Sequence, residues 1–246
     1  MKRRLKIISL VSITFVFVIS LFCVFFDEAV LVRKGTIFRV SGNDKVVALT
    51  FDDGPSPAWT PLILDELKKA NIKATFFMLG QHVEKYPEVA RRVAQEGHEI
   101  GNHTYDHHVL IYYKPEEIVK EVKSAEKIIF ETTGVLTKYI RPPKAWITAK
   151  ERKMIEKLGY KVVLWSLNSK DWVNFDAKYI VRYIAHRVKS GDIILFHDSG
   201  GVFRIEGGDR SETVKSIALL AEALNQKGYK FVTLTELLER ESKWSK

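Results

Sequence analysis

The chain has 246 residues, of which 46% are hydrophobic and 11% aromatic, so it can bury the core of one sizeable domain and is not a disordered chain. Its one cysteine, Cys23, excludes a disulfide scaffold and a cysteine-based zinc site, so any metal has to be bound by His, Asp or Glu. The formal net charge is +9, and because four lysines and arginines precede residue 7, residues 27–246 carry +5. This excess is compatible with binding to an anionic polymer or surface. It does not indicate nucleic-acid binding, because basic and acidic residues are interspersed.

The N-terminal segment predicts a membrane anchor over residues 1–26. Residues 7–26 carry no charge and have about the length that crosses a ~30 Å hydrocarbon core as a helix. The basic residues before them favour a cytoplasmic N-terminus, so we expect a single-pass protein of the cytoplasmic membrane whose remaining residues are extracytoplasmic. A cleaved signal peptide, which would make the protein secreted, is the alternative, but the bulky residues 22–26 do not suit a cleavage site.

Residues 27–44 read as a stalk, and residues 45–240 as one domain in which strands alternate with helices. The predicted strands are Val46–Phe51, Ala74–Leu79, His98–Gly101, Tyr139–Arg141, Val162–Ser166, Ile193–Phe196 and Phe231–Thr233. The predicted helices are 60–70, 86–96, 115–131, 148–158, 176–189 and 211–227. Gly97, Gly159 and Gly228 each follow a helix, where a left-handed cap is easiest for a residue without Cβ. This alternation of seven strands with helices predicts an α/β fold with a parallel sheet, closed as a barrel or doubly wound.

Polar residues with catalytic potential follow the predicted strands rather than the helices. They are Asp52, Asp53, His103, His107, Arg141, Asp171 and His197. In a β/α barrel the carboxyl ends of all strands open onto one face, so we expect these side chains to converge on one pocket.

Two histidines and a carboxylate in this set could bind a metal. His103 and His107 have a spacing that brings two imidazoles to one side of a turn, and Asp53 could add an oxygen. The histidine pair alone is weak evidence, because the same spacing is frequent on surface helices and no glutamate follows His103. His108 is a third candidate, but as the neighbour of His107 it is expected to point elsewhere.

Five motifs, in order, resemble the NodB-homology polysaccharide deacetylases of carbohydrate esterase family 4. They are Thr50-Phe51-Asp52-Asp53-Gly54-Pro55, Gly101-Asn102-His103-Thr104-Tyr105-Asp106-His107, Arg141-Pro142-Pro143, Asp171-Trp172 and Ile194-Leu195-Phe196-His197-Asp198. The resemblance implies a distorted β/α barrel that removes N-acetyl groups from amino sugars with a divalent metal, commonly zinc, with cobalt or manganese as other options.

The resemblance also implies a role for individual residues. Asp53, His103 and His107 match the metal ligands, Asp52 the general base and His197 the general acid. Asp171 matches the partner of that histidine, and Arg141 matches the arginine that positions the base. The backbone N–H of Lys144 matches an oxyanion donor, and Trp172 and Leu195 match an apolar pocket for the acetyl methyl group. Arg141 before two prolines could instead form a rigid turn, and Trp172 could be an ordinary core aromatic.

We therefore expect a hydrolase that deacetylates a cell-wall glycan, with peptidoglycan N-acetylglucosamine as the first candidate substrate. Chitooligosaccharides and N-acetylmuramic acid are alternative substrates, and an inactive wall-binding protein is a different functional class. A glycosidase is less favoured, because adjacent Asp52 and Asp53 should point to opposite faces. The chain departs from the family at Lys144 and Ala145, where an aromatic residue and a glycine are usual, so the substrate groove should differ, and Lys144 could meet a carboxylated glycan. No sequence feature indicates an oligomeric state.

Overall fold

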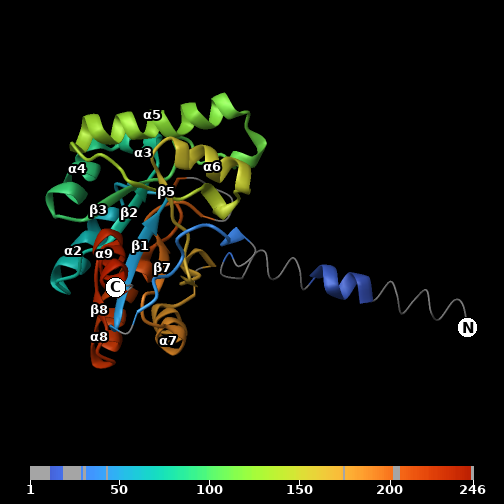
Figure 1. The fold of residues 1–246 in the computed structure, drawn as a ribbon. Helices are drawn as coiled ribbons and strands as arrows, with labels where there is room; N and C mark the ends of the chain where they lie inside the picture. Colours follow the sequence, from blue (N-terminus) through green and yellow to red (C-terminus); the bar gives the residue numbers. More distant parts are fainter. Residues whose placement is uncertain are drawn as a thin grey trace, which may run out of the picture.

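A computed structural model describes residues 12–18, 29, 32–42, 44–173, 175–201 and 206–244. Its centre is a parallel sheet in the order β5-β4-β3-β2-β1-β7-β6, with β8 paired to the start of β1 (Figure 1). The strands are β1 Val46–Asp52, β2 Thr75–Met78, β3 Glu99–Asn102, β4 Tyr139–Ile140, β5 Lys161–Val162, β6 Leu167–Asn168, β7 Ile193–His197 and β8 Lys230–Phe231. The prediction of an α/β fold with a parallel sheet is confirmed.

Helices cover the outside of this sheet and connect its strands (Figure 1). They are α2 Thr60–Lys69, α3 Gly80–Lys85, α4 Pro87–Gln95, α5 Pro115–Thr133, α6 Ala149–Lys157, α7 Ala177–Arg187, α8 Ser211–Gln226 and α9 Leu234–Trp244. Short 3₁₀ segments lie at Leu110–Tyr112, Pro143–Ala145 and Asp171–Val173. The left-handed ends predicted after helices are present, with φ of 76° at Gly97, 93° at Gly159 and 80° at Gly228.

The central strand β1 is buried along its whole length, and its packing fixes the position of its carboxyl end. All seven of its residues are buried, because apolar side chains pack on both faces of the sheet, as is usual for a central parallel strand. On one face Phe51 stacks on Phe76 with ring centroids 5.0 Å apart and lies 5.8 Å from Phe196. The carboxyl end of β1 is thus fixed between β2 and β7.

The sheet curls without closing completely. Among the described residues, the edge strands β5 and β6 do not pair with each other. Residues 37–40, within the predicted stalk, lie across this gap: Ile37 pairs with Val163, Arg39 pairs with Asp192, and Val40 is fully buried. The packed structure therefore includes residues before position 45.

The structure corrects the predicted elements at three places. Of the strand predicted at Val162–Ser166, only Val162 lies in a strand, β5, and β6 begins after it at Leu167. Between them Leu164 N–H donates to the carbonyl of Ile37 and Ser166 N–H donates to the carbonyl of Ile193, and the sheet has eight strands rather than seven. The short helix α3 and the C-terminal helix α9 were not predicted. A six-residue helix such as α3 is too short to show a helical period.

No helix among the described residues is long and apolar enough to cross a membrane. Of the anchor predicted over residues 7–26, the structure describes residues 12–18, which are helical, and the rest of that segment lies outside the described residues.

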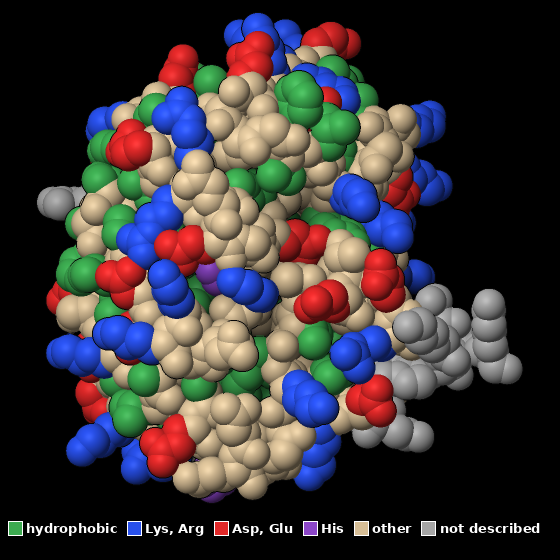
Figure 2. All heavy atoms as spheres, turned by 90° about the vertical axis from the view of Figure 1, so that its left-hand side faces the viewer, with side chains coloured by type: hydrophobic (Ala, Val, Ile, Leu, Met, Phe, Trp, Pro, Cys, Tyr) green, Lys and Arg blue, Asp and Glu red, His purple; other side chains and the backbone are tan. Residues whose placement is uncertain are grey.

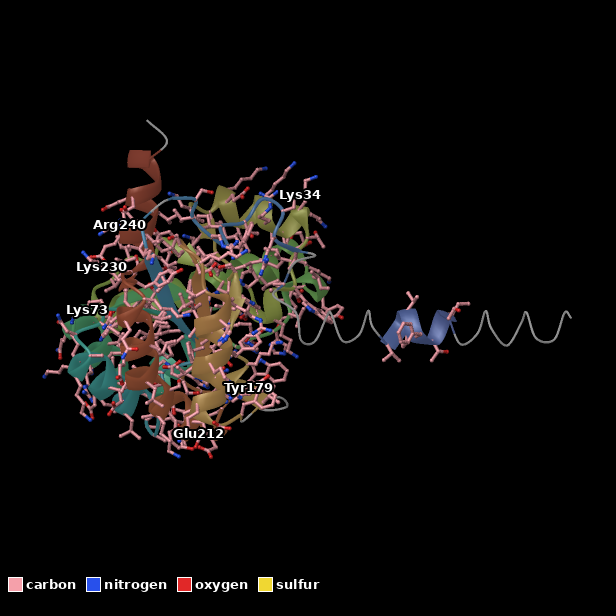
Figure 3. The ribbon with its side chains drawn as sticks, turned by 90° about the horizontal axis from the view of Figure 1, so that it is seen from below. Lys34, Lys73, Tyr179, Glu212, Lys230 and Arg240 are labelled. Carbon is pink, nitrogen blue, oxygen red and sulfur yellow. The ribbon has the colours of Figure 1, made fainter. Side chains whose placement is uncertain are left out.

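The outer surface carries mixed charge. The face shown in Figure 2 has lysines and arginines interspersed with aspartates and glutamates. Seen from below, Tyr179 and Glu212 mark the neighbouring helices α7 and α8 (Figure 3), and Glu212 accepts a hydrogen bond of 2.8 Å from the backbone N–H of Ala177, the first residue of α7. This contact joins the two helices beside β7.

Candidate active site

The register of the parallel strands brings the first polar residues together. Asp52, the last residue of β1, pairs in register with His197, the last residue of β7, and with Phe77 of β2. His103 directly follows β3, and its backbone N–H donates to the carbonyl of Met78 at 2.9 Å. Residues far apart in sequence therefore meet at the carboxyl ends of neighbouring strands.

Asp52 is held by a buried arginine. Arg141 has no exposed surface, and its Nη1 donates to Asp52 Oδ1 at 2.6 Å and to Thr50 Oγ1 at 2.8 Å. The carbonyls of Val163 and Leu164 accept its remaining donors, and the ring centroid of Phe77 lies 4.1 Å from its Cζ. Arg141 therefore fixes one oxygen of Asp52, and the other oxygen, Oδ2, lies 3.8 Å from His103 Nε2.

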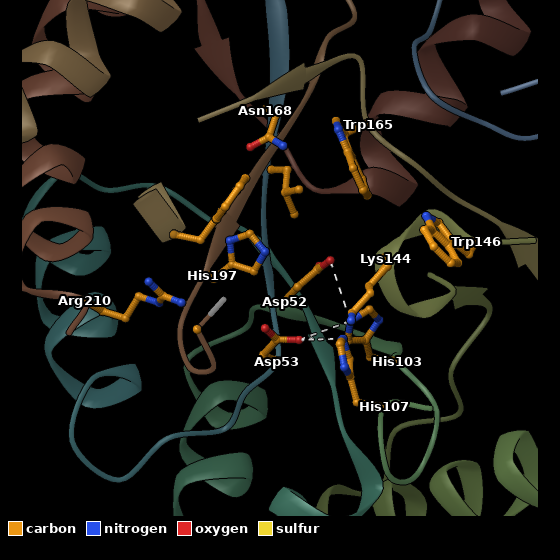
Figure 4. Close-up of a pocket in the computed structure, with 13 residues that line it drawn as sticks. Asp52, Asp53, His103, His107, Lys144, Trp146, Trp165, Asn168, His197 and Arg210 are labelled. Atoms are coloured by element: carbon orange, nitrogen blue, oxygen red, sulfur yellow. Dashed lines mark ion pairs between the residues drawn. The ribbon is translucent and has the colours of Figure 1, made fainter. Parts of the chain in front are cut away.

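Asp53, His103 and His107 form a second cluster beside Asp52 (Figure 4). Asp53 Oδ1 lies 3.4 Å from Nε2 of His103 and 3.2 Å from Nε2 of His107, and the three ligand atoms all lie within 4.8 Å of one another. Burial alone would raise the pKa of Asp53, but the two imidazoles hold that pKa well below its usual value. The carboxylate is therefore ionised and faces two nitrogens.

The details of this cluster fit a divalent cation. Asp53 Oδ1 is buried and accepts no hydrogen bond from the described residues, although both Nε2 atoms face it. Nδ1 of His103 donates to the carbonyl of Arg141 at 2.7 Å, so in the neutral ring Nε2 carries the lone pair and can bind a cation, the usual arrangement of a metal-binding imidazole. At Gly200 a Cβ would lie 2.4 Å from Asp53 Oδ2, so the chain approaches the carboxylate at a place that only glycine permits.

His197 lies on the other side of the two aspartates (Figure 4) and pairs with the fully buried Asp171. Nδ1 of His197 lies 2.8 Å from Asp171 Oδ1, and the backbone N–H of His197 donates to Oδ2 at 2.9 Å. Burial would raise the pKa of Asp171, but the imidazole outweighs burial and holds that pKa at about 2. Burial would likewise lower the pKa of His197, but Asp171 outweighs it and raises that pKa.

These groups surround one cavity of about 230 Å³. Its lining residues are Asp52, Asp53, His103, His107, Lys144, Trp146, Trp165, Asn168, Trp172, Leu195, His197, Gly201 and Arg210. Of the residues predicted from sequence, Arg141 and Asp171 lie behind the cavity and contact Asp52 and His197. The expectation that widely spaced residues converge on one pocket therefore agrees with the geometry.

Sequence reasoning missed several residues of the wall. Trp146, Trp165, Asn168 and Arg210 line the cavity without belonging to a site motif. The one signal that could have pointed to Arg210 is indirect: it follows Gly207 and Gly208, a pair that is typical of a loop. His108, the third candidate imidazole, pairs with Asp106 at 2.6 Å and has an exposed side chain.

Comparisons with known proteins agree with this arrangement. Residues 39–163 match the model of the polysaccharide deacetylase family. The chain is 39% identical over 203 residues to a peptidoglycan-N-acetylglucosamine deacetylase of Bacillus cereus, covering 82% of this chain and 92% of that protein. It is 36% identical over 200 residues to the peptidoglycan-N-acetylmuramic acid deacetylase PdaC of Bacillus subtilis, covering 81% of this chain and 40% of that protein.

A solved structure shares the fold at similar identity. The crystal structure of the Bc1960 peptidoglycan N-acetylglucosamine deacetylase aligns with a TM-score of 0.79 and 36% sequence identity. The alignment covers 85% of this chain and 96% of that one.

Proposed function

The chain belongs to the polysaccharide deacetylase family, and from this membership and the site geometry we propose that it hydrolyses N-acetyl groups of amino sugars in peptidoglycan, first of all N-acetylglucosamine. The observation that supports the chemistry best is the arrangement in one cavity of the Asp53, His103 and His107 cluster, with Asp52 beside it and His197 opposite. The reaction adds water to the acetamide and releases acetate and a free amine.

Asp53, His103 and His107 would hold a divalent cation, which we propose to be zinc. When bound, such a cation lowers the pKa of water and polarises a carbonyl. Asp52 is not one of these ligands. Arg141 holds one of its two oxygens, Oδ1, so Oδ2 is not engaged by that arginine. Asp52 can therefore accept a proton from the attacking water as general base.

His197 is suited to protonate the leaving amine. Its ring lines the cavity while Nδ1 is engaged by Asp171, so Nε2 is the nitrogen that can donate a proton to the substrate. The raised pKa of His197 keeps the acid form populated near neutral pH. Leu195 and Trp172 line the same cavity and offer apolar surface for the acetyl methyl group, and we assign the backbone N–H of Lys144 to the developing oxyanion.

We also propose that residues 1–26 anchor the protein in the cytoplasmic membrane and that the domain over residues 45–240 acts outside it. The uncharged stretch of residues 7–26 and the basic residues before it support this location. Fractionation of cells expressing the full chain, followed by protease treatment of intact cells, tests it: the domain should be membrane-bound and protease-accessible.

The decisive test of activity is incubation of the full-length protein, in detergent, with purified peptidoglycan. Mass spectrometry of the digested glycan should show exchange of acetyl for hydrogen, matched by release of acetate. Chitotetraose serves as the alternative substrate. If neither glycan loses acetyl groups while the protein binds peptidoglycan, the chain is a wall-binding protein instead.

A further inference from the structure

Lys144 stands out in the cavity wall because of its charge. The charged and titratable groups of the lining are Asp52, Asp53, three histidines, Arg210 and Lys144. Arg210 is buried, and its Nη2 donates to the carbonyls of Ser199 and Gly200 at 2.9 and 2.8 Å, so it is committed to the backbone. Apart from His197, whose proton is assigned to the leaving amine, Lys144 is the remaining cation of the described wall.

The ammonium group of Lys144 is not committed to a partner within the part of the chain that the structure describes. Lys144 is exposed and forms no ion pair with any described residue. Some surface lysines are paired, for example Lys69 with Glu66 at 2.6 Å and Lys123 with Glu126 at 2.9 Å, and Lys144 differs from these because it lines the cavity without such a pair. The cation in the cavity wall is therefore available to a ligand.

The backbone fixes where this side chain projects. Lys144 and Ala145 both have positive φ, 56° and 57°, a conformation that costs energy for residues with a Cβ. Hydrogen bonds from Ala145 N–H to Pro142 and from Trp146 N–H to Pro143 hold the turn at 3.0 and 3.2 Å. Strained turns of this kind persist where the surroundings over-determine them, and they are concentrated at functional sites.

The position of the Lys144 side chain relative to the reacting groups restricts the kind of ligand that it can bind. In Figure 4 Lys144 lies on the same side of the cavity as His103 and His107. A ligand there also approaches the carboxylates of Asp52 and Asp53, which would repel an anionic substituent unless a cation compensated. The partly exposed Trp146, next to Lys144 in the wall, offers a flat apolar surface for a sugar ring.

We propose that Lys144 is a specificity-determining residue that binds a carboxylate on the glycan, carried by the reacting amino sugar or by its neighbour. This inference rests on the proposed deacetylase function and names its substrate class as an acidic glycan. The 3-O-lactyl group of a muramic acid unit has the required chemistry, since its carboxylate is joined through an ether oxygen to C3, next to the ring carbon that bears the acetamido group. One relative in the family is named as an N-acetylmuramic acid deacetylase, so such sugars occur among the substrates of this fold.

The test compares three glycans of equal length with the full-length protein. The first alternates N-acetylglucosamine with N-acetylmuramic acid bearing free carboxylates, the second is the same glycan with each carboxylate converted to a methylamide, and the third is chitotetraose. Turnover is followed by acetate release and binding by calorimetry. The wild type should prefer the acid to the methylamide by about tenfold in both kcat/KM and Kd, the size of one charge-assisted hydrogen bond.

Variants assign the preference to one side chain. Lys144→Met keeps the backbone N–H and the side-chain length and should reduce the acid-to-methylamide ratio to about one, whereas Lys144→Arg should preserve it. Lys150→Met, an exposed lysine of α6 that does not line the cavity, is the matched control and should leave the ratio unchanged.

The outcomes separate this inference from the proposed function. Deacetylation of all three glycans at equal rates and with equal Kd would overturn the role of Lys144 and leave the deacetylase function intact. A Lys144→Met protein that keeps the wild-type ratio would overturn it as well. Binding preference for the acid without any turnover would instead contradict the proposed function and support the carboxylate site.

Discussion

The two ends of the parallel sheet differ in how far their buried polar groups are hydrogen-bonded. At the amino-terminal end, Asp192 before β7 is fully buried and accepts hydrogen bonds from Arg39 Nε at 2.6 Å, Ser166 Oγ at 2.5 Å and Lys189 N–H at 2.7 Å. Glu99, which starts β3, similarly accepts from Thr75 Oγ1 and from the N–H of Thr235. Polar groups at this end are paired with one another.

At the carboxyl-terminal end several buried polar atoms are without a hydrogen-bond partner among the described residues. They are Asp53 Oδ1, Thr104 Oγ1, Trp165 Nε1, Asp198 Oδ1 and Ser199 Oγ. Asp198 shows that burial disfavours an ionised carboxylate at this end: burial raises its pKa to about 7, although Thr60 Oγ1 donates to its Oδ2 at 2.6 Å. Unpaired buried groups destabilise a fold, so their concentration around the cavity indicates that this end is arranged for a ligand. Substitutions at the two ends should therefore have opposite consequences for activity and stability.

The largest effect is expected from loss of a proposed metal ligand. His107→Ala should remove the bound cation and reduce turnover on the order of 10³-fold, because several kcal/mol of transition-state stabilisation depend on the cation. Metal content is measured by mass spectrometry of the purified protein and turnover by acetate release. Zinc should raise the melting temperature of the wild type and not that of this variant.

The neighbouring imidazole provides the control. His108→Ala removes an exposed ring that pairs with Asp106 and should retain both metal and activity. Full metal occupancy in His107→Ala would show that the carboxyl-terminal end does not bind a cation through this residue.

The two adjacent aspartates should differ from each other. Asp52→Asn should retain the metal but lose about 10²-fold or more in kcat, the usual contribution of a positioned general base. Asp53→Asn should weaken the metal itself, because Asp53 Oδ1 faces both imidazoles. Equal metal loss in the two variants would show that the base and ligand roles are not separable.

At the amino-terminal end the expected effect is on stability alone. Asp192→Ala removes the acceptor of three hydrogen bonds and should lower the free energy of unfolding by about 2 kcal/mol, a value reduced because the Arg39 side chain is 34% exposed. Urea unfolding measures the change, and kcat/KM should stay within about twofold of the wild type at temperatures where the variant is folded. Asp65→Ala, which breaks an exposed pair with Arg92, is the control and should cost under about 1 kcal/mol. A stable Asp192→Ala protein with low activity would contradict the division between the two ends.

The sequence predicted the carboxyl-terminal end of the sheet better than its amino-terminal end. Apolar runs that end in Asp52 or His197 identify both a strand and its polar terminus, because the parallel strands of one sheet share a direction. The break between β5 and β6 was not predictable in the same way, since it depends on pairing with Ile37, more than a hundred residues earlier in the chain. Arg210 was missed for a related reason: its partners are backbone carbonyls, which leave no trace in residue type.

The smallest and most informative effect concerns Asp171, which lies at the carboxyl-terminal end yet is fully paired. Ser169 Oγ, Thr213 Oγ1 and the backbone N–H of His197 donate to its two oxygens, and Nδ1 of His197 lies 2.8 Å from Oδ1, so it resembles the satisfied groups of the other end. If Asp171 serves catalysis by keeping His197 protonated, Asp171→Asn should lower kcat/KM about tenfold, which is equivalent to one pKa unit of lost interaction. The alkaline limb of the pH–rate profile should move to lower pH, because the pKa of His197 is raised by this carboxylate and falls without it.

The contribution of Asp171 to the free energy of unfolding depends on pH in the opposite range. The pKa of Asp171 is lowered from 3.8 to about 2, so its contribution is complete above about pH 4 and is lost as the pH falls toward 2; the variant should lack this acid-side loss. Thr213→Val, which removes one hydroxyl donor and keeps the carboxylate, is the control and should shift the alkaline limb far less. An Asp171→Asn protein that is less stable but has an unchanged rate and alkaline limb would place Asp171 with the structural groups, and the proton for the leaving amine would need another source.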